Sequence, residues 1–255
     1  MKTIELFGRV LCVGDKPTLA ACFSDSPGRG GRSMFFCNVH MLMLSQQDAG
    51  LASAMLSADF VFPDGVPIAW LQRRLGFTEA DVFRGEEALE QVCERATAEG
   101  QSIGFYGASG EVLSELASNL QQRYPDLKIG YLQAPGKIAN EPAFDNHVAD
   151  QINAQNLSCL FIGLGCPKQE KWAALYASKL NCDLVCVGAV FDWYAGKTRK
   201  PPDWTVNAGL AWLYRLLQDP RRMWRRYLVY NSKFIIMTIK LMLSGGPNSK
   251  KKAGR

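Results

Sequence analysis

The sequence predicts an α/β fold: a Rossmann-like, mostly parallel sheet flanked by helices, followed by a basic helical C-terminal appendage. Short apolar runs alternate with segments of ~10–15 residues whose apolar positions recur at helical spacing. Several runs end abruptly in glycine, proline and polar residues, as "LFIGLGCPKQEKW" and "ADFVFPDGVPIAW" do. Such alternation indicates a parallel sheet covered on both faces, so ligand sites are expected where the strands end.

The individual elements follow from local signals. Residues 1–14 alternate weakly and indicate an edge hairpin. Apolar runs predict strands at 33–39, 59–62, 102–107, 127–132, 158–165 and 183–188. Helical spacing and stop signals such as Gly100 predict helices at 41–57, 66–75, 86–99, 112–123, 145–156, 168–180, 205–217 and 221–243. We expect a core over 1–204, the appendage over 205–247 and a disordered basic tail over 248–255.

The composition is that of a globular protein, with 47% hydrophobic and 21% charged residues. No apolar run reaches the ~18 residues of a spanning helix, and the N-terminus shows no secretory signal. Eight scattered cysteines without a Cys-x-x-Cys pair predict buried thiols in a reducing cytosol. The two histidines, His40 and His147, are far apart in the sequence, which argues against a histidine-based zinc site.

The net charge of +5 conceals an asymmetry between the two ends of the chain. Residues 215–255 contain 11 basic residues and one acid, Asp219, whereas 1–214 contain 18 basic and 23 acidic residues. A basic segment favours phosphate-bearing partners: nucleic acid, lipid headgroups or a bound nucleotide.

The loop in "IGLGCPKQE" suits an anion. Gly163 and Gly165 let backbone amides approach a ligand, and Pro167 fits the first turn of a helix. A helix start offers free N–H groups, to which Lys168 and Gln169 add side-chain donors. The loop is a candidate for a diphosphate or its attached sugar. The alternative is that the glycines only allow the chain to turn.

Three other strand ends contain candidate residues. Asp64 in "FPDG" follows a buried strand, where partial desolvation would raise its pKa and suit a general base. Gly107 in "YGASGEVL" begins a glycine turn without the full dinucleotide fingerprint. Gly188 and Asp192 in "VGAVFDWYAG" suit a ribose or base. Taken singly, Asp64 is better explained as a turn aspartate that bonds its own backbone, and Asp192 as a structural residue.

The appendage interleaves arginines with aromatic residues. Arg222, Arg225 and Arg226 share one helical face, and guanidinium groups bind diphosphates bidentately. The neighbouring aromatics and "FIIMTIKLML" form an amphipathic helix suited to a membrane surface. A solvated basic face packed on its own domain is the alternative.

These segments occur together, in one order, in a known family. The set comprises "NV" at 38–39, "ADFVFPDGVPIAW", "RGEEAL", "IGFYGASGEVL", "LFIGLGCPKQEKW", "CVGAVFDWYAG", "KPPDW" and "GLAWLYRLLQDPRRMWRRYL". Over 34–228 the chain resembles the WecG/TagA/CpsF glycosyltransferases, glycosyltransferase family 26. The resemblance implies metal-independent, inverting transfer from a UDP-sugar to a sugar on a polyprenyl diphosphate, at the inner face of the cytoplasmic membrane. It implies no cofactor and no nucleic-acid partner, and it leaves a homo-oligomer open.

The resemblance also implies roles for residues of the core. Asp64 matches the family's base, which would deprotonate the acceptor hydroxyl as that oxygen attacks the anomeric carbon. Asn38 and Gln169 match residues that line the donor sugar, while Gly188 and Asp192 would lie near the uridine.

In the appendage, Arg215, Arg222 and Arg225 match arginines that close over the diphosphate. Cationic groups of this kind would stabilise the developing charge of UDP as it leaves. Further candidate site residues are Arg84, Gly107, Gly165 and Lys168.

The chain departs from the family pattern at two positions near the sugars. Where some members have Thr it has Phe36, and where some have Arg it has Val82, with Arg84 beside Gly85 instead. The forms "RGEEAL" and "GCPKQE" are closer to exopolysaccharide members. The prediction is therefore a hexose donor of the glucose or N-acetylmannosamine type, with glucose favoured.

Two other classes remain open at this stage. One is a nucleotide-dependent oxidoreductase, for which the chain lacks a complete glycine fingerprint. The other is a non-catalytic membrane-surface module driven by the basic appendage.

Overall fold

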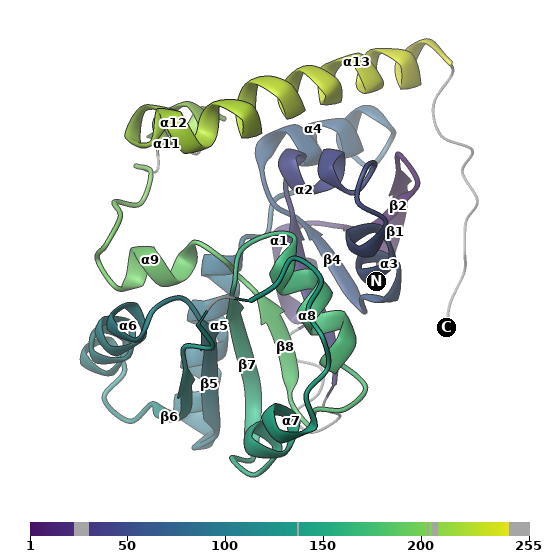
Figure 1. Ribbon diagram of the computed structural model, residues 1–255. Coiled ribbons are helices and arrows are strands. Elements are labelled where there is room, and N and C mark those ends of the chain that lie inside the picture. Colours follow the sequence, from purple (N-terminus) through teal and green to yellow (C-terminus); the bar gives the residue numbers. More distant parts are fainter. Residues whose placement is uncertain (23–30, 137, 203, 206–208, 245–255) are drawn as a thin grey trace.

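The computed structural model describes residues 1–22, 31–136, 138–202, 204–205 and 209–244. Its main sheet has six strands in the order β4-β3-β8-β7-β5-β6, and every neighbouring pair is parallel (Figure 1). The strands are β3 (Ser33–Cys37), β4 (Phe60–Pro63), β5 (Ser102–Gly107), β6 (Lys128–Gln133), β7 (Leu157–Gly163) and β8 (Asp183–Cys186). The predicted parallel α/β sheet is confirmed.

The sheet separates two hydrophobic cores. One lies under α2 (Val39–Leu44), α3 (Ala49–Ser57), α4 (Val66–Arg74), α7 (Asn146–Asn153) and α8 (Lys168–Tyr176). The other lies under α1 (Lys16–Ala21), α5 (Gly85–Glu99), α6 (Gly110–Arg123) and α9 (Val190–Tyr194). Phe35 belongs to the first core and Phe36 to the second, as expected for a strand that is buried on both faces.

The predicted N-terminal hairpin is present, but it is not an edge of the main sheet. Strands β1 (Lys2–Leu6) and β2 (Arg9–Val13) pair antiparallel in a sheet of their own. Leu6 and Leu11 are buried in the first core, so the hairpin closes the side of the molecule near β4.

Two sequence expectations are wrong in detail. The helix expected over 41–57 is divided into α2 and α3, because Asp48 caps a new helix by accepting the Leu51 N–H at 2.8 Å. The loop expected after the last strand contains the short helix α9.

Among the described residues from 209 to 244, the appendage contains four helical segments. They are α11 (Ala211–Gln218), α12 (Pro220–Trp224), the π-helical turn η1 (Arg225–Val229) and α13 (Tyr230–Leu243). Of the helix expected over 205–217, Thr205 and α11 are helical in the described part of the chain, and the expected disordered tail at 248–255 lies outside that part.

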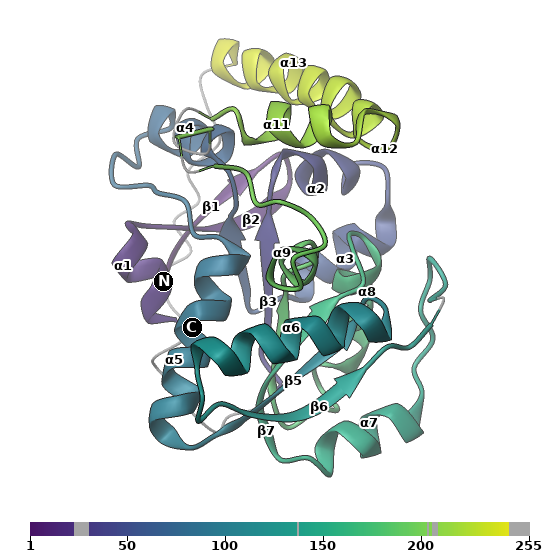
Figure 2. The ribbon, with the colours of Figure 1, turned by 90° about the vertical axis from the view of Figure 1, so that its left-hand side faces the viewer.

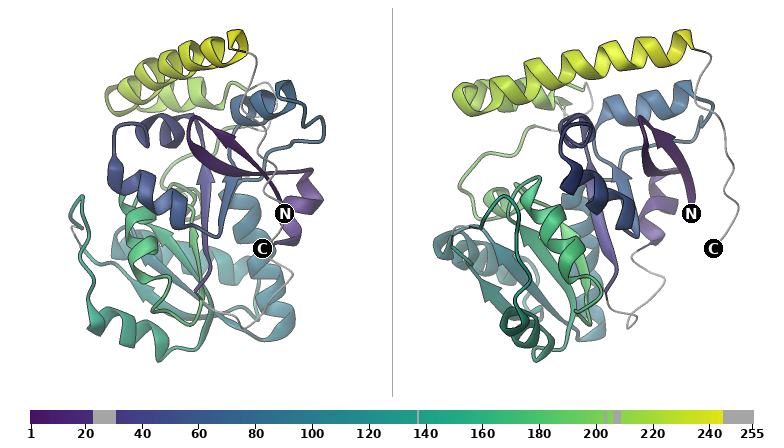
Figure 3. Two further views of the ribbon diagram at one scale, coloured as in Figure 1. Left: turned by 90° about the vertical axis from the view of Figure 1, so that its right-hand side faces the viewer. Right: turned by 45° about the vertical axis from the view of Figure 1, so that its right-hand side comes forward.

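The appendage lies at the edge of the sheet where the strands end. Helix α13 crosses above α2, which itself begins at the carboxyl end of β3 (Figures 2 and 3). The Phe7 and Phe234 ring centroids are 6.1 Å apart, and those of His40 and Tyr230 are 4.9 Å apart. Among the described residues, no helix is both long enough and apolar enough to cross a bilayer.

The cysteines are part of the packing. All eight lie in the described part of the chain, none forms a disulfide, and seven are buried. Burial raises the pKa of Cys12 to about 12, which keeps this thiol protonated at neutral pH. The predicted buried thiols are thus confirmed except at the half-buried Cys166.

Candidate functional site

Five strand ends meet at one edge of the sheet. In the parallel registers Cys37 pairs with Pro63, and Cys186 pairs with both Phe35 and Ile162. Residues that follow these strands therefore leave the sheet side by side. They are Asn38 after β3, Asp64 after β4, Gly188 after β8 and Gly165 after β7, with Gly107 at the end of β5.

Asp64 lies at the junction of β4 and β3. Its backbone N–H donates to the Cys37 carbonyl at 2.9 Å, which extends the ladder one residue beyond β4. Gly65 then has a φ of +120°, a conformation that strains any L side chain, and the chain turns into α4. The pKa of the buried Cys37 thiol is raised by burial and further by the nearby Asp64 carboxylate. This half-buried carboxylate at a fixed strand end has the placement of a general base.

Asn38 is the N-cap of α2. Its Oδ1 accepts the Met41 N–H at 3.1 Å, which satisfies a backbone donor of the first helical turn. This bond fixes the Asn38 side chain at the end of β3 through its Oδ1 and does not use its Nδ2 amide. The predicted contact with a donor sugar stays a prediction.

Gln169 holds the loop after β7. Its Oε1 accepts the Gly165 N–H at 3.1 Å, and its Nε2 donates to Oε1 of Glu170 at 2.8 Å. A Cβ atom at Gly188 would lie 3.3 Å from the Gln169 Oε1, so the loop after β8 passes directly over this amide. The predicted residues Gly165, Gln169 and Gly188 are thus brought together. Gln169 is only 6% exposed, so support of the loop is the role its contacts establish.

Lys168 points away from this cluster. Its Nζ donates to the Ile138 carbonyl at 2.7 Å, in the segment that follows β6. The next lysine of α8, Lys171, pairs with Asp48 at 2.9 Å and with Glu141. The two lysines anchor the segment after β6 to α8, and a direct contact of Lys168 with a ligand stays a prediction.

Gly107 lies where two neighbouring strands send the chain to opposite faces of the sheet. After β5 the chain enters α6 on one face, and after the neighbouring β7 it enters α8 on the other. In open α/β sheets such a switch point is the usual ligand site. Gly107 has a φ of +131°, and a Cβ there would lie 2.5 Å from the Gly163 backbone, so no larger residue fits. Ser109 then caps α6 by accepting the Val112 N–H at 3.3 Å.

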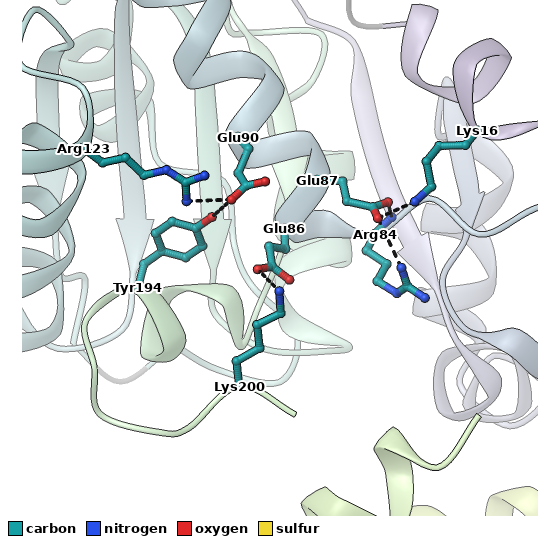
Figure 4. Close-up of polar contacts among 8 residues, drawn as sticks. All are labelled: Lys16, Arg84, Glu86, Glu87, Glu90, Arg123, Tyr194 and Lys200. Carbon is teal, nitrogen blue, oxygen red and sulfur yellow. Dashed lines mark hydrogen bonds and ion pairs between the residues drawn. The ribbon is translucent and has the colours of Figure 1, made fainter. Parts of the chain in front are cut away.

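Arg84 lies at the same edge but pairs within its own helix. Its guanidinium is 3.2 Å from the Glu87 carboxylate, which also contacts Lys16 at 2.7 Å (Figure 4). A Cβ at Gly85 would lie 3.1 Å from Val187, so the start of α5 packs closely against the end of β8. Arg84 is therefore near the strand ends, held by Glu87.

The appendage reaches the site through Arg215. Its guanidinium carbon lies 4.6 Å from the centroid of the Trp193 ring in α9. Trp193 directly follows Asp192, whose carbonyl accepts the Lys197 N–H at 2.9 Å. The two predicted residues Arg215 and Asp192 therefore both adjoin Trp193, the first through space and the second along the chain. The side chains of Arg222 and Arg225 lie outside the described part of the structure.

Sequence reasoning missed the contacts that hold α9 in place. Tyr194 donates its hydroxyl to Glu90 at 2.8 Å, and Lys200 pairs with Glu86 at 2.6 Å (Figure 4). The acidic run in "RGEEALE" and the aromatic pair in "FDWY" were the available signals. The acidic and aromatic partners, however, are far apart in the sequence: Glu90 and Tyr194 are separated by 104 positions.

The chain matches known proteins over most of its length. The profile described as the glycosyl transferase WecG/TagA/CpsF family matches residues 17–247. The chain is 29% identical over 186 residues to the N-acetylglucosaminyldiphosphoundecaprenol N-acetyl-beta-D-mannosaminyltransferase of Bacillus spizizenii, covering 72% of this chain and 70% of that protein. The protein of the same name from Bacillus subtilis (strain 168) is 27% identical over 193 residues, covering 75% and 73%.

A third relative of that name, from Staphylococcus aureus (strain MW2), is 28% identical over 169 residues, covering 66% of this chain and 65% of the relative. The profile match includes both the sheet and the appendage, and it favours a glycosyltransferase over the oxidoreductase and binding-module alternatives. The chain belongs to the WecG/TagA/CpsF family and is a glycosyltransferase.

Proposed function

We propose that the chain transfers a hexose from a UDP-sugar to a sugar carried on a polyprenyl diphosphate, in the synthesis of an exopolysaccharide or cell-wall polymer. The observation that supports this most directly is the junction of β4 and β3, where Asp64 and the Asn38 cap lie on adjoining strand ends. The relatives are named as enzymes acting on N-acetylglucosaminyldiphosphoundecaprenol, which supports a lipid-linked acceptor.

In the proposed reaction Asp64 is the general base. Its carboxylate accepts the proton of the acceptor hydroxyl while that oxygen forms a bond to the anomeric carbon of the donor. The bond from this carbon to the UDP oxygen breaks, and UDP leaves with the electron pair. Attack on the face opposite UDP inverts the anomeric configuration. Asn38 would orient the donor sugar through its Nδ2, and the Gly188 loop would lie against the nucleotide.

Cationic side chains take the place of a metal in this proposal. The leaving UDP develops negative charge, and Arg215, with Arg222 and Arg225 of the appendage, would neutralise it. Within the described residues no group of three or more His, Cys, Asp or Glu side chains is placed to hold a metal ion.

The donor is proposed to be of the glucose or N-acetylmannosamine type. The names of the relatives support N-acetylmannosamine. The departures at Phe36 and Val82 weaken that inference, because both side chains are buried and apolar here and Phe36 packs on Phe62 with ring centroids 5.5 Å apart. The forms "RGEEAL" and "GCPKQE", which resemble exopolysaccharide members, favour glucose. A transfer assay with both donors distinguishes them.

We also propose that the enzyme works at the inner face of the cytoplasmic membrane. Helix α13 buries Phe234 against the core and turns a row of large apolar side chains outward, namely Ile235, Ile236, Ile239 and Leu243. Residues 220–244 contain no acid, so this surface is complementary to anionic lipids. Its proximity to the strand ends supports delivery of a lipid-linked acceptor to Asp64.

The test is sugar transfer from UDP-glucose, UDP-N-acetylglucosamine, UDP-N-acetylmannosamine and its uronic acid to a polyprenyl-diphosphate sugar, with chelator present. Transfer from one donor that survives chelation and collapses in Asp64→Asn supports the reaction and its base together. If no donor is used and no UDP-sugar binds, the proposal is wrong. Loss of transfer on chelation, restored by a divalent cation, would overturn metal independence alone.

A further inference from the structure

One contact joins the appendage to helix α9, which follows the Gly188 turn proposed to lie against the nucleotide. Arg215 of α11 lies over the indole of Trp193, with its guanidinium carbon 4.6 Å from the ring centroid. Both side chains are half-buried. A cation over an indole face at this distance is attracted by the ring electrons, and more strongly where water is partly excluded.

The indole is on a rigidly held helix. The side chain of Asn119 donates to the Tyr194 carbonyl at 2.7 Å, and the Tyr194 hydroxyl donates to Glu90 at 2.8 Å. Glu90 in turn pairs with Arg123 at 2.7 Å (Figure 4). Burial and the adjoining Glu90 raise the pKa of Tyr194, so its hydroxyl remains a donor at neutral pH. Trp193 is therefore a fixed surface.

The chain that leads from α9 to α11 is also tied to α5. Lys200 is 2.6 Å from Glu86, whose side chain is only 13% exposed. The ion pair holds Lys200, seven residues after Trp193, against α5 (Figure 4). Glu86 and Glu90 lie one turn apart, so a single face of α5 holds both helix α9, through Tyr194, and the chain after it, through Lys200.

The stack occupies the flat face of the guanidinium and none of its hydrogen bonds. Within the described part of the chain the buried Nε of Arg215 has no hydrogen-bond partner. A guanidinium presents its donors in the plane of the group, where they match the oxygens of a phosphate. Stacking on Trp193 thus fixes the plane in which the guanidinium donors point and uses none of them.

We propose that Trp193 is a positioning residue, whose indole holds the Arg215 guanidinium beside the Gly188–Asp192 loop so that it binds the diphosphate of the donor. This rests on the proposed function, because the diphosphate belongs to a UDP-sugar. The competing explanation is that the stack only packs the appendage against the core.

The experiment measures binding of UDP and of uridine to the full chain by calorimetry. The variants are Trp193→Leu, Trp193→Phe, Arg215→Ala and the double variant Trp193→Leu/Arg215→Ala. Trp70→Leu, which removes a half-exposed indole from α4, is the matched control. Thermal unfolding of each variant reports on packing.

We expect Trp193→Leu to weaken UDP binding about three- to thirty-fold, the range of a partly desolvated cation–π contact. Uridine binding should be unchanged, Trp193→Phe should restore most of the UDP affinity, and the double variant should bind UDP as weakly as Arg215→Ala. In the transfer assay the loss should appear in KM for the donor and not in KM for the acceptor.

Three results would overturn the proposal. One is UDP affinity in Trp193→Leu equal to that of Trp70→Leu. Another is equal weakening of uridine and UDP, and the last is additive losses in the double variant. A wild-type chain that binds no UDP would contradict the proposed function itself, which separates the two failures.

Discussion

The Asp64 N–H donates to the Cys37 carbonyl at 2.9 Å, so the candidate base is held by the backbone ladder between β4 and β3. Asn38, the residue after Cys37, is fixed by its own cap bond to Met41. Both polar side chains are thus positioned by main-chain hydrogen bonds at strand ends. Sites built on such elements keep their geometry better than sites on loops.

Replacing Asp64 by Asn should remove catalysis while leaving the fold and the nucleotide site intact. The amide preserves the shape of the side chain but cannot accept the acceptor proton, so kcat should fall by about 10²–10⁴. UDP affinity and the midpoint of thermal unfolding should change little. Steady-state transfer, calorimetry and thermal melts measure these three quantities. A variant with normal kcat would show that another group is the base.

Replacing Gln169 by Glu should make stability depend on pH. The new carboxylate would lie beside Glu170, which is 1% exposed, and both charges would be poorly solvated. Burial and the like charge would raise the folded-state pKa of the new group above its unfolded value of about 4.3. The variant should therefore be closest to the wild type near pH 4 and lose about 2–4 kcal/mol of unfolding free energy by pH 8.

The measurement is the difference in denaturant midpoint between variant and wild type across this pH range. Gln122→Glu, on the exposed side of α6, is the control and should show no such trend. A difference that is constant with pH would mean that position 169 is open to water.

Much of the fold follows from local sequence signals. The strands are predicted because continuous apolar runs such as "LFIG" of β7 and "MFF" of β3 are buried on both faces. Gly100 ends α5 in the left-handed conformation expected of a glycine cap. The split at Asp48 was missed because the apolar spacing continues through it, and only the capping bond reveals the break.

The site was predictable in position but less so in role. Parallel strands place Asn38, Asp64 and Gly188 at one edge whatever the side chains do. Whether a polar group faces a ligand or a neighbour depends on contacts distant in sequence. Lys168 donates to the Ile138 carbonyl, and Gln169 is hydrogen-bonded to Gly165 and Glu170. No local sequence pattern specifies these partners.

Gly107→Ala should disrupt the switch point between β5 and β7. The backbone φ of +131° strains an L side chain, and the new Cβ would lie 2.5 Å from the Gly163 carbonyl carbon. We expect a loss of about 2–4 kcal/mol in unfolding free energy and weaker UDP binding. Gly110→Ala, three residues on in the first turn of α6 with no atom within 4 Å of its Cβ, should stay within about 1 kcal/mol of wild type. Equal stability of the two variants in urea melts would contradict this account.

The outward face of α13 should determine binding to lipid vesicles. Ile239 is 52% exposed on this face, and inserting its side chain into a bilayer removes apolar area from water worth about 1.5–3 kcal/mol. Ile239→Asp should also repel anionic lipids, so cosedimentation with vesicles containing phosphatidylglycerol should weaken at least about tenfold. Leu56→Asp is the matched control, because Leu56 is 80% exposed on α3, away from the appendage. If both variants bind vesicles as the wild type does, α13 is not the membrane surface. If both weaken equally, general negative charge explains the loss.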